Sequence, residues 1–121
     1  MIVVDTSVWV DHLRSADQKL STLIADAGVL QHPYVTGEIA VGNLHNRHQT
    51  IRALLRLPQI DPVSVADFHA FTEESVVYGT GLGFVDIHLL AATAAFPGAR
   101  LWTKDRRMRE HAEQLGLAQL P

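Results

Sequence analysis

Two aspartates stand where a parallel sheet would bring a carboxylate into contact with a ligand. Asp5 directly follows the short β-branched run Ile-Val-Val, and Asp105 comes soon after a second short run, Leu-Trp-Thr, at 101–103. Ligands of parallel sheets bind at the carboxyl ends of the strands, so acids at two such ends are placed for chemistry. Each also has a structural interpretation, because Asp at this point caps the helix that follows.

Two further acids lie in apolar surroundings. Asp86 is the only formally charged residue between Glu74 and Arg100, within Gly-Phe-Val-Asp-Ile-His-Leu-Leu-Ala-Ala. A helix that is apolar on nearly every face is buried, and an unpaired carboxylate there is costly to desolvate, so Asp86 needs a partner. Glu38 lies near the start of a helix of small and apolar residues. For both acids the alternative is a place in the first helical turn, facing the helix dipole.

Four carboxylates that meet at one edge of a sheet would repel one another unless a divalent cation lay among them. Ligands that are all oxygen suit Mg²⁺ or Mn²⁺, not zinc. The formal net charge is −3, from 13 acids and 10 bases, but setting these four acids aside leaves the two signs nearly balanced. Half of the bases fall within residues 100–109, so the local field there can attract a polyanion.

Composition limits the class of protein. The chain has 121 residues, 47% of them hydrophobic, which predicts one globular domain spanning 1–121. It contains no cysteine, which excludes a disulfide framework and thiolate chemistry and fits a reducing cytoplasm. The opening Met-Ile-Val-Val-Asp is not a signal peptide, and no stretch is long and apolar enough to span a membrane.

The elements that must position the acids alternate along the chain. Short strands are predicted at 2–4, 29–31 and 101–103, with a further edge strand at 117–120. The first strand is followed by a helix through Val8, Trp9 and Leu13, and further helices are predicted at 17–27, 33–41, 44–57, 64–78, 84–95 and 105–115. Strands that alternate with helices indicate an α/β fold: a parallel sheet of four to five short strands with helices on both faces.

The order and spacing of these pieces resemble one family. Ile-Val-Val-Asp5-Thr6-Ser7-Val-Trp, Glu38 in a helix of small residues, Gly-Phe-Val-Asp86-Ile-His-Leu-Leu-Ala-Ala, and Leu-Trp-Thr103-Lys-Asp105 are together similar to the PIN domain, specifically the VapC-type toxins of bacterial toxin–antitoxin pairs. The resemblance covers the whole chain.

The resemblance implies a metal-dependent endoribonuclease in which Asp5, Glu38, Asp86 and Asp105 hold Mg²⁺ or Mn²⁺. It implies that Ser7 and Thr103 orient these acids through their hydroxyls. The bases that adjoin Asp105 are expected to bind the phosphates of the RNA; they are Lys104, Arg106, Arg107 and Arg109. A cognate VapB-type antitoxin, a homodimer and a cytoplasmic location are also expected. The alternative is a catalytically silent PIN-like module that only binds RNA or a protein.

Overall fold

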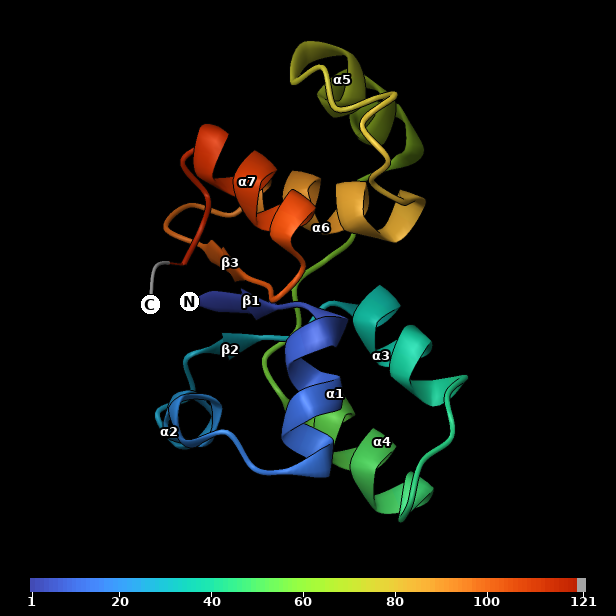
Figure 1. The fold of residues 1–121 in the computed structure, drawn as a ribbon, viewed down its shortest axis with the longest axis vertical. Coiled ribbons are helices and arrows are strands. Elements are labelled where there is room, and N and C mark those ends of the chain that lie inside the picture. Colours follow the sequence, from blue (N-terminus) through green and yellow to red (C-terminus); the bar gives the residue numbers. More distant parts are fainter. Residues whose placement is uncertain (120–121) are drawn as a thin grey trace.

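The computed structural model describes residues 1–119, which form three strands and seven helices (Figure 1). The strands are β1 (Ile2–Val4), β2 (Val29–Leu30) and β3 (Arg100–Trp102). They are parallel and lie in the order β2-β1-β3, so that β1 is central and Val3 is opposite both Leu30 and Leu101. The predicted α/β class is confirmed.

Both faces of the central strand are covered. Val3 and Val4 are each fully buried, and successive side chains of a strand point to opposite faces of the sheet. The flanking strands are apolar in the same way, since Val29 and Leu101 are also buried. A continuous apolar run of this kind is typical of a parallel sheet between two helical layers.

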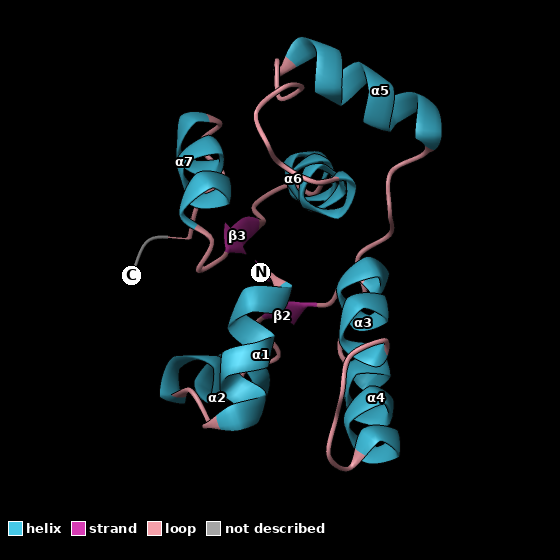
Figure 2. Ribbon diagram, turned by 45° about the vertical axis from the view of Figure 1, so that its right-hand side comes forward, coloured by secondary structure: helices cyan, strands magenta, loops and turns pink. Residues whose placement is uncertain are grey.

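The helices lie in two groups, one on the side of β2 and one on the side of β3 (Figures 1 and 2). On the side of β2 are α1 (Thr6–Arg14), α2 (Gln18–Ala25), α3 (Pro33–Ala40) and α4 (Arg47–Arg56). On the side of β3 are α5 (Val65–Glu74), α6 (Phe84–Ala95) and α7 (Arg106–Gln114). Within residues 1–119, none of these helices has the length and apolar character needed to cross a membrane.

The prediction of four to five strands was wrong: the sheet has three. Single parallel bridges extend it at each edge, between Gln31 and Gln59 and between Leu101 and Ala118. Near Gln59 the bridge cannot grow into a ladder, because Pro58 and Pro62 lack backbone N–H groups. At the other edge the predicted strand at 117–120 is reduced to the Ala118 bridge, and Leu120 lies outside the described residues.

Helix boundaries differ most where the backbone takes a left-handed conformation. The helix predicted at 44–57 begins at Arg47, because Asn46 has a φ of 51°. The helix predicted at 64–78 ends at Glu74, shortly before Val76 with a φ of 50°. The helix predicted at 17–27 likewise ends before Ala27, with a φ of 53°. The hydrophobic periodicity continues through all three points, so it could not show these ends.

The connection through α6 sets the direction of the site. α6 ends at Ala95 and the chain enters β3 at Arg100, so the C-terminus of α6 lies at the start of that strand. The N-terminus of α6, with Asp86, therefore lies toward the carboxyl ends of the strands, where Asp5 follows β1. Residues 87–93 of α6 are buried without interruption, as its apolar sequence predicts.

Candidate functional site

Asp5 is held by two hydroxyl groups. Its side chain is buried, and its Oδ2 accepts hydrogen bonds from Ser7 Oγ and Thr103 Oγ1, each at 2.8 Å. Asp5 occupies the N-cap position of α1, but its carboxylate accepts no capping hydrogen bond from a backbone N–H of that helix. The capping interpretation of Asp5 was therefore wrong, because its carboxylate turns toward the loop after β3.

The same two hydroxyls fix the loop that carries Asp105. Thr103 Oγ1 accepts a hydrogen bond of 3.0 Å from the backbone N–H of Asp105, and Ser7 Oγ accepts one of 3.0 Å from the backbone N–H of Lys104. The two hydroxyl oxygens lie 3.4 Å apart. This network joins the carboxyl ends of β1 and β3 through side chains.

Asp105 caps α7. Its Oδ1 accepts a hydrogen bond of 3.0 Å from the backbone N–H of Met108. Capping satisfies one of the unpaired N–H groups of the first helical turn. The structural interpretation of Asp105 is thus confirmed, and it leaves Oδ2 of the same carboxylate without a hydrogen bond in the described part of the chain.

Asp86 is the third residue of α6 and is half-buried. Its Oδ2 accepts a hydrogen bond of 3.0 Å from the backbone N–H of Gly83. Burial raises the pKa of Asp86 above its ordinary value, the Gly83 hydrogen bond opposes this, and the negative charges of Asp5 and Asp105 add to the rise. The three aspartates are therefore close enough to interact electrostatically.

Glu38 approaches from a different element. It is the sixth residue of α3, which begins at Pro33 as predicted, so the alternative interpretation of Glu38 as an acid of the first helical turn is excluded. Glu38 is exposed, and its Oε1 accepts a hydrogen bond of 2.6 Å from Thr6 Oγ1. Sequence reasoning did not assign this role to Thr6, although its place directly after Asp5 is a signal for it.

His32 positions α3 and was also not identified from the sequence. It is fully buried, and its Nδ1 accepts a hydrogen bond of 3.0 Å from the backbone N–H of Tyr34 at the start of α3. Burial, with the neighbouring His88, lowers the pKa of His32 to about 4. A neutral His before Pro33 is the available signal, because Pro favours the first position of a helix.

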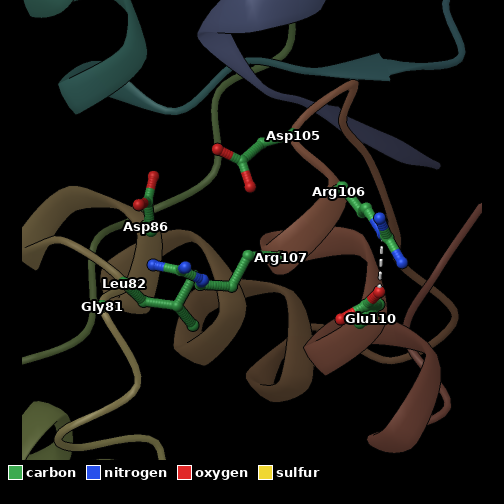
Figure 3. Close-up of a pocket in the computed structure, with 7 residues that line it drawn as sticks. All are labelled: Gly81, Leu82, Asp86, Asp105, Arg106, Arg107 and Glu110. Carbon is green, nitrogen blue, oxygen red and sulfur yellow. Dashed lines mark hydrogen bonds and ion pairs between the residues drawn. The ribbon is translucent and has the colours of Figure 1, made fainter.

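An open cleft of about 500 Å³ lies between α6, the loop that precedes it, and α7 (Figure 3). It is lined by Gly81, Leu82, Asp86, Asp105, Arg106, Arg107 and Glu110. The structure thus brings Asp86 and Asp105 into one cleft. Asp5 lies near enough to affect Asp86, but neither Asp5 nor Glu38 is among the described residues that line the cleft.

The four acids provide oxygen donors of the type that Mg²⁺ and Mn²⁺ prefer. In each of them one carboxylate oxygen accepts a hydrogen bond, and the other has none within residues 1–119. One oxygen thus fixes the side chain and the other stays available for a ligand. Across those same residues, however, no three Asp, Glu or His side chains are grouped closely enough to hold a metal ion.

The bases near Asp105 differ in their partners. Lys104 Nζ forms an ion pair of 2.9 Å with Asp11, and Arg106 Nε forms one of 3.0 Å with Glu110. All four side chains are largely exposed, and such pairs contribute little to stability and exchange readily. Arg107 lines the cleft, whereas Arg109 is exposed and lies outside the described lining.

Comparison with known proteins shows what the whole chain is similar to. The family model described as "PIN domain" matches residues 2–114, a range that includes all four acids. Over 118 residues the chain is 39% identical to the protein named Ribonuclease VapC32 in Mycobacterium tuberculosis, both in strain CDC 1551 / Oshkosh and in strain ATCC 25618 / H37Rv. The aligned region covers 98% of this chain and 95% of each relative.

Proposed function

The chain belongs to the PIN-domain family, and on this basis we propose that it is a metal-dependent endoribonuclease, the toxin of a VapBC-type toxin–antitoxin pair. The similarity to Ribonuclease VapC32, over nearly the full length of both chains, supports a nuclease that acts on RNA. The observation that carries the proposal is that three acids from separate parts of the chain meet at one edge of the sheet: Asp86 and Asp105 line one cleft, and Thr103 links the Asp5 carboxylate to the backbone N–H of Asp105.

In this proposal Asp5, Glu38, Asp86 and Asp105 would hold Mg²⁺ or Mn²⁺ through their available oxygens. These side chains must approach one another when the cation binds, because within residues 1–119 no three of them are grouped closely enough to hold it. When bound, a divalent cation offsets the negative charge of the phosphodiester and makes water easier to deprotonate. Ser7 and Thr103 hold Oδ2 of Asp5, so that Oδ1 keeps one orientation toward the ligand. Such outer hydrogen bonds set the geometry of a carboxylate ligand.

The remaining steps fall to protein groups around the acids. A carboxylate oxygen that the cation does not engage orients the attacking water by accepting its hydrogen bond. Hydrolysis then forms one bond from water oxygen to phosphorus and breaks one bond from phosphorus to the leaving oxygen, and a proton lost by the water is balanced by one gained at the leaving oxygen. Lys104, Arg106, Arg107 and Arg109 bind the flanking phosphates, which positions the RNA without reading its bases.

The exposure of the acids bears on how the proposed nuclease is inhibited. Glu38 and Asp105 are exposed, and the cleft is open, so the protein needs an external partner to silence it. We propose a cognate VapB-type antitoxin that folds onto the toxin and covers these acids. We further propose that the toxin is a homodimer that acts in the cytoplasm.

The competing function is a catalytically silent PIN-like module that binds RNA or a protein. The growth of cells that express the chain distinguishes the nuclease from the silent module. We expect poor growth when the chain is expressed alone, rescue by its neighbouring reading frame, and normal growth with Asp5→Asn at equal protein level. Asp26→Asn, an exposed acid at the end of α2, is the matched control and should remain toxic. Growth arrest that persists with Asp5→Asn would favour the silent module, acting by sequestration.

A further inference from the structure

Arg107 differs from the neighbouring bases in where its guanidinium lies. Its side chain extends from α7 across the cleft to Gly81, and the guanidinium lies on the side of Asp86 (Figure 3). Arg106 instead turns to Glu110 (Figure 3). Two successive residues of one helix are thus directed differently, and only Arg107 reaches the loop before α6.

Gly81 provides the space that the guanidinium occupies. A Cβ atom at Gly81 would overlap Arg107 Nη1 and lie 3.1 Å from Arg107 Cζ. Because the overlap involves the far end of a flexible side chain, a methyl group here would displace the guanidinium. Any side chain at position 81 therefore moves Arg107 out of its position in the cleft.

Gly79, in the same loop, distinguishes the backbone strain of a substitution from its contact with Arg107. Gly79 has a φ of +69° and Gly81 a φ of +87°, so both adopt a conformation that L side chains rarely take. A Cβ at Gly79 would meet nothing within 4 Å. Alanine at Gly79 and at Gly81 thus carries a similar backbone cost, but only the second touches Arg107.

The positive charge of Arg107 has no ion-pair partner among the described residues. Across residues 1–119 its guanidinium forms no ion pair within 4.0 Å, although Asp86 and Asp105 line the same cleft. A guanidinium binds phosphate with two parallel hydrogen bonds, which gives it geometric specificity that a lysine lacks. In the proposed nuclease, the phosphodiester reaches the acids through this open cleft, which Asp86 and Asp105 line.

We propose that Gly81 is a positioning residue: because it has no side chain, the Arg107 guanidinium can lie beside Asp86. There the guanidinium binds an RNA phosphate next to the bond that is cut. This inference rests on the proposed nuclease function and adds a phosphate subsite to it. It also predicts that Gly81 and Arg107 act as one unit, so that changing either has the same effect on RNA binding.

The test is a double-mutant cycle on RNA affinity. Gly81→Ala, Arg107→Ala and the double variant are made in an Asp5→Asn background, which keeps the RNA intact. Binding of a short fluorescein-labelled single-stranded RNA of mixed sequence is titrated at several salt concentrations in magnesium. Controls are Gly79→Ala for the backbone and Arg14→Ala, at the end of α1, for loss of one positive charge elsewhere. Thermal unfolding checks that each variant folds.

We expect Arg107→Ala to weaken binding about tenfold, as for loss of a charge-assisted hydrogen bond, and to reduce the salt slope by about 0.7. Gly81→Ala should have the same two effects, and should cause no further loss once Arg107 is absent. Gly79→Ala and Arg14→Ala should bind like the parent protein.

Two results would overturn the inference while the nuclease function stands: Gly81→Ala with unchanged affinity, or an equal loss from Gly81→Ala with and without Arg107. Arg107→Lys provides a second route if Gly81→Ala does not fold, because it should recover part of the affinity lost in Arg107→Ala through its charge alone. Full recovery would contradict a bidentate phosphate contact. A wild-type chain that neither binds nor cuts RNA would overturn both proposals together.

Discussion

Thr103 donates a hydrogen bond of 2.8 Å to Oδ2 of Asp5, although the two residues are 98 positions apart in the chain. The contact forms because β1 and β3 are paired in parallel, which brings their carboxyl ends to the same edge. Thr103 is buried and also accepts the backbone N–H of Asp105. One hydroxyl therefore orients one acid and the backbone of another.

Thr103→Val tests this role. The change removes the hydroxyl but keeps a branched side chain, and it leaves the Asp105 N–H without its acceptor. We expect about 1–3 kcal/mol lower unfolding free energy, and about 10- to 100-fold slower RNA cleavage. Thr93→Val is the control, because Thr93 is also buried but bonds only its own helix, through Leu89 O at 2.6 Å. It should lose stability and keep activity; equal loss of activity in both variants would contradict the role of Thr103.

Asp86→Asn tests the electrostatic strain at the site. The pKa of Asp86 is higher in the folded protein than in the unfolded chain, so its contribution to stability is lost as pH rises through the folded pKa. Asn keeps an oxygen that can accept the Gly83 N–H but carries no charge. With chelator present, we expect Asp86→Asn to melt above the wild type at about pH 7, with a difference that shrinks as the pH is lowered. Cleavage should be lost. A lower melting temperature at neutral pH would instead mark Asp86 as a structural ion-pair partner.

Asp105 combines a cap and a charge, which two variants separate. Asp105→Ala removes both, so we expect about 1 kcal/mol lower stability together with slower cleavage. Asp105→Asn keeps an acceptor for the Met108 N–H and should lose cleavage with a smaller loss of stability. Asp17→Ala is the control for capping, because Asp17 Oδ1 accepts from Leu20 N at 3.0 Å at the start of α2. Unchanged cleavage in Asp105→Asn would show that Asp105 only caps α7.

The lowered pKa of His32 predicts that the stability of the fold depends on pH. Its pKa is lowered from 6.5 to about 4, so the unfolded chain binds a proton more readily between these values. Stability should therefore fall as the pH is lowered through that range. Asn at position 32 can accept the Tyr34 N–H and does not titrate, so His32→Asn should flatten the curve measured by chemical denaturation. His48→Asn, on the exposed start of α4, is the control for replacing a histidine outside the core. The same slope in His32→Asn as in the wild type would contradict this assignment.

Most of the fold was predictable from the sequence because its periodicity is strong. The apolar runs at Ile2–Val4 and in α6 predict a strand and a buried helix, and both are found. The segments beyond β2 and β3, at Gln59 and Ala118, could not be predicted as strands or excluded as strands from the sequence. Their pairing consists of single bridges, and the prolines that limit one of them lie beyond the pattern of the strand itself.

The positions of the acids were predictable, but their individual roles were not. Asp5 and Asp105 stand in the same sequence context, an acid near a strand end, yet only Asp105 caps its helix. The difference arises from Thr103, whose hydroxyl reaches Asp5 across the sheet, a long-range contact that no local pattern contains. The role of Gly81 could not be predicted for the same reason, since Arg107, which occupies the space beside it, comes from α7.

The central claim is that these carboxylates cut RNA with a divalent cation. The most direct measurement is cleavage of total cellular RNA by the purified protein in magnesium, in chelator, and in chelator followed by excess magnesium, for the wild type, Asp5→Asn and Asp26→Asn. We predict that the wild type and Asp26→Asn cut RNA in magnesium, stop in chelator and resume when magnesium is restored. Asp5→Asn should be at least about 100-fold slower, as expected when a ligand of a catalytic cation is changed. Cleavage that persists in chelator, or that Asp5→Asn retains at the wild-type rate, would contradict the account.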